Sequence, residues 1–166
     1  MGCGKSSVGR RLSELLCCSF IDLDDVIEER EGRSIPEIFA TEGEAAFRQM
    51  ELEALKAVLK ERHTNNDIVL ALGGGAVMTE ACALMVREKT LCVYLRASVD
   101  TLVEHLAGEA AGRPMLADAD LRTRIETLMQ QRSATYEKTA HVTIDTDGKT
   151  IEAIASDIIS ITSKFS

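Results

Sequence analysis

The first residues of the chain combine glycines, a lysine and a serine in a spacing that suits phosphate binding. Met1-Gly2-Cys3-Gly4-Lys5-Ser6 fits the last six positions of the pattern Gly-x-x-x-x-Gly-Lys-Ser/Thr. In such a loop backbone N–H groups turn around the phosphates, the lysine reaches the β- and γ-phosphates, and the hydroxyl binds Mg²⁺. The positive end of the following helix adds to this cradle. The pattern predicts a nucleotide site made of Gly2, Cys3, Gly4, Lys5, Ser6 and Ser7.

Two acids follow the next apolar run, in the segment 19–24. A carboxylate at Asp22 or Asp24, beside the phosphate loop, can hold Mg²⁺ through water or accept a proton from an attacking hydroxyl. The alternative is that these acids only cap the next helix. We favour the functional interpretation because both acids come at the end of a predicted strand.

Three consecutive glycines, 73–75, end another apolar run. Glycine costs backbone entropy on folding, and a simple turn needs only one or two. This triplet therefore indicates a close approach of the backbone to a ligand.

Three arginines are candidates for binding anions. Arg132 interrupts an apolar helical stripe and must direct its guanidinium towards the protein body, where it needs an anion. Either a carboxylate ligand or an internal salt bridge would satisfy it. Arg48, with Glu51 one turn later, leaves the same two alternatives. Arg113 lies in a small-residue loop, where it could reach the γ-phosphate or simply be solvated.

The segments that must position these residues alternate between strands and helices. Capping-box patterns at Ser34/Glu37 and Thr41/Glu44 predict two helix starts, the second opening a helix to about Arg62. Apolar runs that are unbroken by polar residues are typical of a parallel sheet covered on both faces. Ligands of such sheets bind at the carboxyl ends of the strands. We expect strands over 19–22, 68–72, 91–95 and 141–145, and helices from the phosphate loop and over about 24–32, 41–62, 98–106, 120–139 and 151–159.

The composition bounds the class of protein. A chain of 166 residues predicts one domain. Its formal net charge of −8 argues against a nucleic-acid-binding face. An odd number of cysteines without metal-ligand spacing indicates free thiols and a reducing compartment, which we take to be the cytoplasm. The sequence has neither an apolar run long enough to cross a membrane nor a signal-peptide pattern.

Taken in order, these segments resemble the shikimate kinase family along nearly the whole chain. The similarity is specific because many short motifs recur together with the right spacing. They are Gly4-Lys5-Ser6, Phe20-x-Asp22-x-Asp24, Gly32-Arg-Ser-Ile-x-x-Ile-Phe39, Gly43-Glu44-x-x-Phe47-Arg48-x-x-Glu51, Leu72-Gly73-Gly74-Gly75, Arg113-Pro114-x-Leu116 and Arg132-x-x-x-Tyr136-x-x-x-Ala140.

The resemblance implies transfer of the γ-phosphoryl group of ATP to the 3-hydroxyl of shikimate, in aromatic amino-acid biosynthesis. It implies a P-loop kinase of the nucleoside-monophosphate-kinase type, an α/β fold with a five-stranded parallel sheet between helical layers. The chain would be one kinase domain over 1–166, with a substrate-binding segment at about 24–62 and a lid at about 107–119. The expected partners are ATP and shikimate, with neither nucleic acid nor membrane, and the protein would act as a monomer.

The resemblance also implies a role for each site residue. Asp24, Arg48, Gly74, Gly75 and Arg132 would bind shikimate, with Asp24 as the base and the two arginines on the carboxylate. Glu51 would hold Arg48, and Phe39 and Phe47 would line the pocket. Lys5 and Arg113 would stabilise charge on the phosphates, beside Gly2, Cys3, Gly4, Ser6 and Ser7. Ser6 and Asp22 would hold Mg²⁺.

Two departures from the family pattern leave alternatives open. The strand that normally precedes the phosphate loop is missing, so we expect about 8–12 further residues before Met1 in the natural protein, a strand and the start of the loop. His105-Leu106 stand where the family often has an adenine-stacking arginine. The alternatives are a related kinase, such as one acting on gluconate, and an inactive protein that binds only the acceptor.

Overall fold

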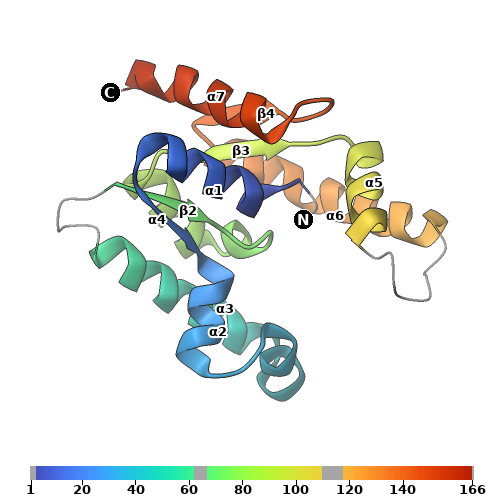
Figure 1. Ribbon diagram of the computed structural model, residues 1–166. Helices are drawn as coiled ribbons and strands as arrows, with labels where there is room; N and C mark the ends of the chain where they lie inside the picture. Colours follow the sequence, from blue (N-terminus) through green and yellow to red (C-terminus); the bar gives the residue numbers. More distant parts are fainter. Residues whose placement is uncertain (1–2, 62–66, 110–117, 166) are drawn as a thin grey trace.

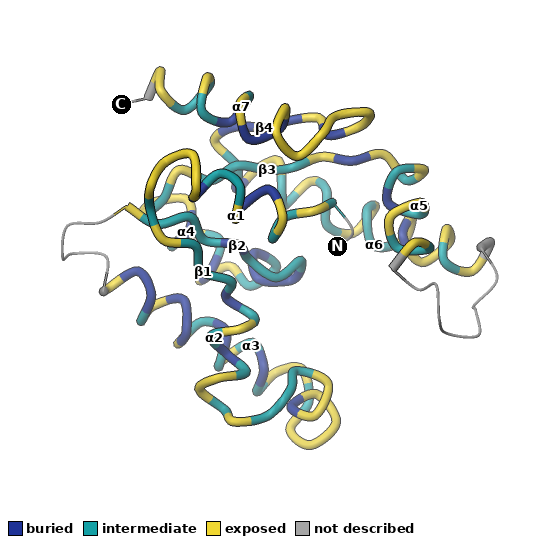
Figure 2. The backbone as a smooth tube through the Cα atoms, in the orientation of Figure 1, coloured by how far each residue is buried: buried dark blue, intermediate teal, exposed yellow. Residues whose placement is uncertain are grey.

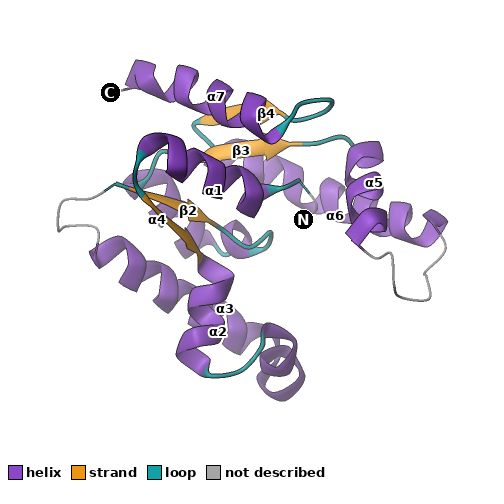
Figure 3. Cartoon of the chain, in the orientation of Figure 1, coloured by secondary structure: helices purple, strands orange, loops and turns teal. Residues whose placement is uncertain are grey.

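The computed structural model describes residues 3–61, 67–109 and 118–165 (Figure 1). Helices lie on both sides of short strands, as Figure 3 shows. The elements, in chain order, are α1 (Lys5–Leu16), β1 (Ser19–Asp22), α2 (Leu23–Glu31), α3 (Ile35–Glu61), β2 (Ile68–Ala71), the 3₁₀ turn η2 (Ala76–Met78), α4 (Glu80–Lys89), β3 (Val93–Arg96), α5 (Val99–Glu109), α6 (Asp118–Thr139), β4 (Val142–Asp145), α7 (Ile151–Thr162) and the 3₁₀ turn η3 (Ser163–Phe165).

The strands form two parallel pairs. β1 pairs with β2 so that Asp22 lies opposite Ala71, and β3 pairs with β4 so that Arg96 lies opposite Asp145. Each of the predicted strands is present, within two residues of its expected bounds. The expected single sheet is not: among the described residues β2 and β3 are not paired, and the sheet is divided into two halves.

A trench separates the two halves of the sheet. Its volume is about 600 Å³, and its walls come from β2, β3, α1 and α7. A smaller cavity of about 110 Å³ shares Leu72, Val93 and Leu95 with the trench, and Met129 and Tyr136 of α6 also line it. The facing edges of β2 and β3 therefore border empty, mostly apolar space on both faces of the sheet.

The apolar core is divided in the same way. One cluster packs α2, α3 and α4 around Leu23, Ile27 and Leu55, beneath the β1–β2 pair. A second packs α1 and α7 against the β3–β4 pair through Val8 and Ile158. A third joins α5 to α6. Figure 2 shows buried stretches on α3, low in the view, and on β4 and α7, high in the view.

Close packing of α1 on β1 fixes the position of the phosphate loop. A Cβ atom added at Gly9 would lie 2.6 Å from the ring of Phe20. The guanidinium of Arg10 lies 4.7 Å from the centre of the same ring. The absence of a side chain at Gly9 therefore lets the helix after the loop contact the strand that carries Asp22.

Only one of the two predicted capping boxes forms. Ser34 and Glu37 cap each other: the Ser34 N–H donates to Glu37 Oε2 at 2.8 Å, and the Glu37 N–H donates to Ser34 Oγ at 3.4 Å. The prediction of a second box at Thr41 and Glu44 is wrong. The Thr41 hydroxyl donates to the carbonyl of Glu37 at 2.8 Å, so Thr41 still belongs to the preceding helical turn.

The helical break comes at Gly43 instead. Its φ of 82° and ψ of 179° lie in a region that only glycine adopts readily. The long second half of α3 therefore starts after Gly43 and is described as far as Glu61, while Arg62, its predicted end, lies outside the described residues.

All five cysteines are free thiols. Cys17, which adopts the left-handed conformation at the C-cap of α1, is exposed.

None of the helices in the described ranges has the length and apolarity needed to cross a membrane.

Candidate functional site

The start of α1 has the geometry of an anion site. Gly4 adopts the left-handed conformation with φ 74°, and its carbonyl accepts the N–H of Val8 at 2.9 Å, which closes the first helical turn. The N–H groups of Lys5, Ser6 and Ser7 therefore have no partner within the helix. The ammonium of Lys5 lies beside Cys3, with 4.0 Å between Nζ and Sγ. Gly2, predicted for the same site, lies outside the described residues.

Asp22 joins this loop to the next helix. Its Oδ2 accepts a hydrogen bond from the Ser6 hydroxyl at 2.8 Å, and its Oδ1 accepts the Asp24 N–H at 3.1 Å as the N-cap of α2. Asp22 therefore caps α2, as the alternative interpretation expected, and its second oxygen faces Ser6, the other predicted metal ligand.

The Ser6 and Asp22 pair fits Mg²⁺ better than a metal that needs many protein ligands. No group of three or more potential His, Cys, Asp or Glu ligands occurs among the residues described. Mg²⁺ usually keeps several waters and binds through one or two protein oxygens together with substrate phosphates. The hydroxyl and the carboxylate supply that kind of oxygen ligand, beside the anion site of α1.

Asp24 lies in the first turn of α2 and faces the glycine triplet. A Cβ atom added at Gly73 would lie 2.8 Å from Asp24 Oδ1. Burial raises the pKa of Asp24 above the usual aspartate value, the neighbouring Asp22 raises it further, and the charge of Lys5 opposes the shift. A carboxylate with a raised pKa, near the phosphate loop, is suited to accept a proton.

Arg48 lies on the other side of the triplet, held by a buried acid. Its Nη1 donates to Glu51 Oε2 at 2.8 Å, and Glu51 is only 1% exposed. Burial raises the pKa of Glu51, and the charge of Arg48 opposes that shift. A Cβ atom at Gly75 would collide with the Arg48 guanidinium. The internal salt bridge considered for Arg48 therefore exists, and it fixes the guanidinium against the triplet.

Arg132 differs from Arg48 because no such partner holds it. It is half-buried on α6, one turn before Tyr136, and no ion pair of its guanidinium occurs within the described part of the chain. Its charge still lowers the pKa of Glu51, against the effect of burial. An arginine near a buried acid, without a carboxylate of its own, is available to an anionic ligand.

The remaining predicted residues divide into three groups. Phe39 and Phe47 stack with their ring centres 4.7 Å apart, but Phe47 is buried in the core, which leaves Phe39 as the exposed ring. His105 is exposed on α5, whereas Leu106 packs in the α5–α6 cluster. Arg113 and residues 110–117 of the predicted lid lie outside the described residues.

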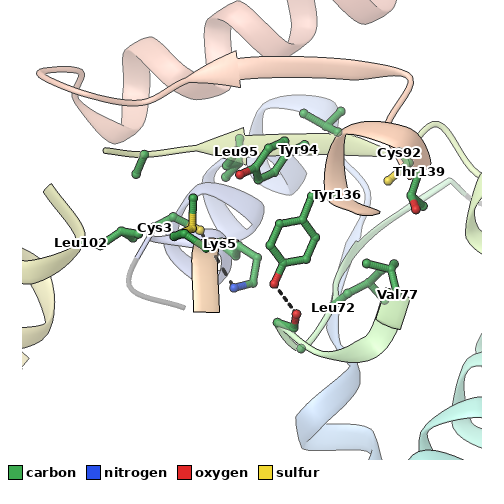
Figure 4. Close-up of a pocket in the computed structure, with 15 residues that line it drawn as sticks. Cys3, Lys5, Leu72, Val77, Cys92, Tyr94, Leu95, Leu102, Tyr136 and Thr139 are labelled. Carbon is green, nitrogen blue, oxygen red and sulfur yellow. Dashed lines mark hydrogen bonds between the residues drawn. The ribbon is translucent and has the colours of Figure 1, made fainter. Parts of the chain in front are cut away.

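One contact was not predicted from the sequence. The Tyr136 hydroxyl of α6 donates to the carbonyl of Gly74 (Figure 4). The only signal for it was the position of Tyr136 in the same helical stripe as Arg132.

Comparison with known proteins gives a consistent result. A family model described as "Shikimate kinase" matches residues 1–163. The shikimate kinase of Salinibacter ruber is 39% identical, over 97% of this chain and 80% of that protein. The shikimate kinase of Thioalkalivibrio sulfidiphilus is 42% identical, over 95% of this chain and 80% of that protein.

Solved structures agree with the sequence relatives. A shikimate kinase from Acinetobacter baumannii in complex with shikimate superposes with a TM-score of 0.86 at 32% identity, covering 99% of this chain and 89% of that one. A gluconokinase from Sinorhizobium meliloti covers 99% of this chain and 88% of that one, with a TM-score of 0.59 at 20% identity, and so shares only the fold.

Proposed function

The chain belongs to the shikimate kinase family, and from this premise we propose how its residues divide the work of the reaction. The protein is an ATP-dependent kinase that phosphorylates shikimate in aromatic amino-acid biosynthesis. The acceptor oxygen, which the family resemblance identifies as the 3-hydroxyl, attacks the γ-phosphorus of ATP. The bond from that phosphorus to the β–γ bridging oxygen breaks, ADP leaves, and a base takes the hydroxyl proton.

We place the acceptor between Asp24, Arg48, the glycine triplet and Arg132. Asp24 orients the attacking hydroxyl and accepts its proton, which a partly buried carboxylate of raised pKa does readily. Arg48, fixed by Glu51, and Arg132 bind the shikimate carboxylate. The backbone of Gly74 and Gly75 forms the pocket wall, because a side chain on the triplet would collide with the residues on either side.

We place the phosphates of ATP at the start of α1. The N–H groups from Cys3 to Ser7 and the ammonium of Lys5 would bind them, with Gly2 and Arg113 in the same group by family resemblance. Ser6 and Asp22 would hold Mg²⁺ beside the phosphates, because their oxygens lie 2.8 Å apart next to the start of α1. When bound, Mg²⁺ would neutralise negative charge on the transferring phosphoryl group.

The larger-scale expectations belong to the same proposal. We propose one kinase domain over 1–166, with the acceptor segment at about 24–62 and a lid at about 107–119, acting as a cytoplasmic monomer. We also propose that the two half-sheets belong to one five-stranded parallel sheet whose central strand lies in the trench. The unpaired, facing edges of β2 and β3 support this arrangement.

One observation carries the assignment of the acceptor site. Asp24 and Arg48 approach the two ends of a single glycine triplet, so a potential base and a fixed cation flank the same bare backbone. A carboxylated alcohol fits this arrangement, because its acid can bind the arginines while its hydroxyl faces Asp24 and the phosphate loop.

Arg132→Ala provides the test. Calorimetry should show shikimate binding weakened by about 2–5 kcal/mol, the usual effect of removing one partner of a buried charge pair. ATP binding should be unchanged, because Lys5 and the start of α1 are intact. Arg124→Ala is a matched control, since Arg124 is an exposed arginine of the same helix. Equal shikimate affinity in Arg132→Ala and the wild type would refute the carboxylate assignment.

A coupled assay with the wild-type protein separates the remaining alternatives. Turnover with ATP, Mg²⁺ and shikimate, but not with gluconate, is the expected result. Shikimate binding without turnover or ATP binding would instead indicate an inactive protein that retains only the acceptor pocket.

A further inference from the structure

The glycine triplet has no side chains of its own to hold it, so its backbone contacts determine where it lies. Two of its three carbonyls are used locally: the Ala76 N–H donates to Gly73 at 3.1 Å, and the Met78 N–H donates to Gly75 at 3.0 Å. The middle carbonyl, of Gly74, accepts the hydroxyl of Tyr136 instead. This hydrogen bond joins the centre of the triplet to a helix 62 positions away in sequence.

Tyr136 is itself held in a defined position. Its ring packs on the ring of Tyr94 from β3, with the centroids 5.2 Å apart and the planes at 42°. Figure 4 shows the hydroxyl of Tyr136 reaching from this pair to the backbone of the triplet. Since Arg132 is four residues earlier on α6, both side chains lie on one face of the helix.

A shift of the triplet would be transmitted directly to the acceptor site. A Cβ atom added at Gly73 would lie 2.8 Å from Asp24 Oδ1, and one added at Gly75 would collide with the Arg48 guanidinium, so both side chains occupy the space beside the triplet. Any movement of Gly74 therefore changes the space between the proposed base and a proposed carboxylate ligand. The same movement changes the distance from the triplet to Arg132.

We propose that Tyr136 is a positioning residue for the acceptor pocket: through Gly74 it fixes the backbone wall between Asp24 and Arg48 and aligns that wall with Arg132. This inference rests on the proposed function, because it assumes that the acceptor binds there. Tyr136 does not touch the reacting atoms, so its effect should appear in acceptor affinity more than in phosphoryl transfer itself.

Tyr136→Phe removes the hydroxyl and keeps the packed ring. Loss of one neutral hydrogen bond predicts shikimate affinity about 3- to 10-fold weaker by calorimetry, with a matching rise in KM for shikimate. We expect kcat and the KM for ATP to change less than 2-fold. Tyr94→Phe is the matched control, because it removes a hydroxyl from the other ring of the same stack and should leave shikimate affinity unchanged.

Amide hydrogen exchange provides a readout that does not depend on catalysis. In Tyr136→Phe without ligands, exchange in the segment 73–78 should become faster, while exchange in α7 stays as in the wild type. If shikimate affinity is unchanged, or if shikimate and ATP affinities fall together, the positioning role is wrong. Unchanged exchange in 73–78 would likewise overturn it.

The two experiments also distinguish this inference from the proposed function. If the wild type did not bind shikimate at all, the proposed function would fail whatever the exchange data showed. If the wild type bound shikimate and Tyr136→Phe bound it equally well, only the inference about Tyr136 would fail.

Discussion

Asp22 and Asp24 are two residues apart in sequence, yet the structure gives them different tasks. Asp22 uses both carboxylate oxygens, one as the N-cap of α2 and one towards Ser6. Asp24 is not the cap, and its partly buried carboxylate faces the glycine triplet. A cap interpretation for both acids would have predicted that Asn could replace either one. The structure restricts that expectation to Asp22.

Asp24→Asn should therefore abolish most turnover while making the fold more stable. An amide cannot accept the proton, so kcat should fall strongly while nucleotide still binds. Partial burial raises the pKa of Asp24 in the folded state, so its charged form lowers the stability of the fold at pH values above that pKa. Asn removes this cost, so the melting temperature at pH 7 should rise.

The pH dependence checks the sign of this effect. Since the pKa of Asp24 is higher in the folded than in the unfolded state, the cost is present above the folded pKa and vanishes below the unfolded pKa. The stability gain of Asp24→Asn should therefore shrink as the pH is lowered, and the activity of the wild type should fall as Asp24 becomes protonated. A nearly normal rate in Asp24→Asn would show that this carboxylate is not the base.

The sequence indicated candidate residues for the acceptor site but not what each one contacts. Residue types and their order indicated Asp24, Arg48 and Arg132. Asp24 follows a predicted strand, and an arginine directed into the protein needs an anion. The sequence left open whether that anion is internal. The answer differs between Arg48, which pairs with the buried Glu51, and Arg132, which has no such partner among the described residues. It depends on helix rotation and packing, which spacing alone does not specify.

At the scale of elements, the predicted and observed helix starts differ because of a single glycine. The sequence around Thr41 satisfies the capping-box pattern, but the preceding helix continues through Thr41, and Gly43 makes the break. Gly43 has a φ near +82°, a conformation that other residues adopt only with strain. The second half of α3 begins after this break. Arg48 and Glu51 lie one turn apart on it and form an ion pair.

Gly43→Ala should destabilise the protein by roughly 1–3 kcal/mol, because residues other than glycine are strained in this conformation. No atom lies within 4 Å of a Cβ placed there, so the effect is backbone strain and not a clash. Urea unfolding measures the difference. Gly108→Ala in α5 is the control: its Cβ also meets open space, its φ is not positive, and alanine is the better helix former. Equal stability of the two variants would contradict the strained conformation at Gly43.

At the scale of the whole molecule, the main feature is the divided sheet. β2 and β3 face each other across the trench, and each has one edge without a strand partner in the described structure. A strand placed between them would direct alternate side chains towards the trench and towards the smaller cavity beside Tyr136. Both spaces are lined mainly by apolar side chains, so such a strand should be apolar on both faces.

An engineered extension tests this arrangement. We expect that about five or six β-branched apolar residues, followed by Gly and one further residue before Met1, will raise the melting temperature and strengthen ATP binding. The stabilisation comes from pairing strand edges whose unsatisfied groups each cost about 1–3 kcal/mol. The control is an extension of equal length with Asp at alternate positions. If both extended chains have the same melting temperature as the original chain, no strand enters the trench.

The fold class could be predicted because strands and helices alternate, and strand positions were correct within two residues. The expected single sheet was not observed, because among the described residues no strand joins β2 to β3. The hydrogen bond from Tyr136 to Gly74 could not be predicted in this way. It joins residues 62 positions apart, and local pattern carries no information about which residues meet at that separation.

The trench also affects how the molecule responds to compression. A folded protein that encloses empty volume occupies more space than its unfolded chain with the surrounding water, so hydrostatic pressure favours unfolding in proportion to the voids that unfolding removes. A trench of about 600 Å³ between the half-sheets is large for a chain of 166 residues. The 166-residue chain should therefore lose more volume on unfolding than a chain whose N-terminal extension fills the trench, and at the same temperature it should unfold at a lower pressure.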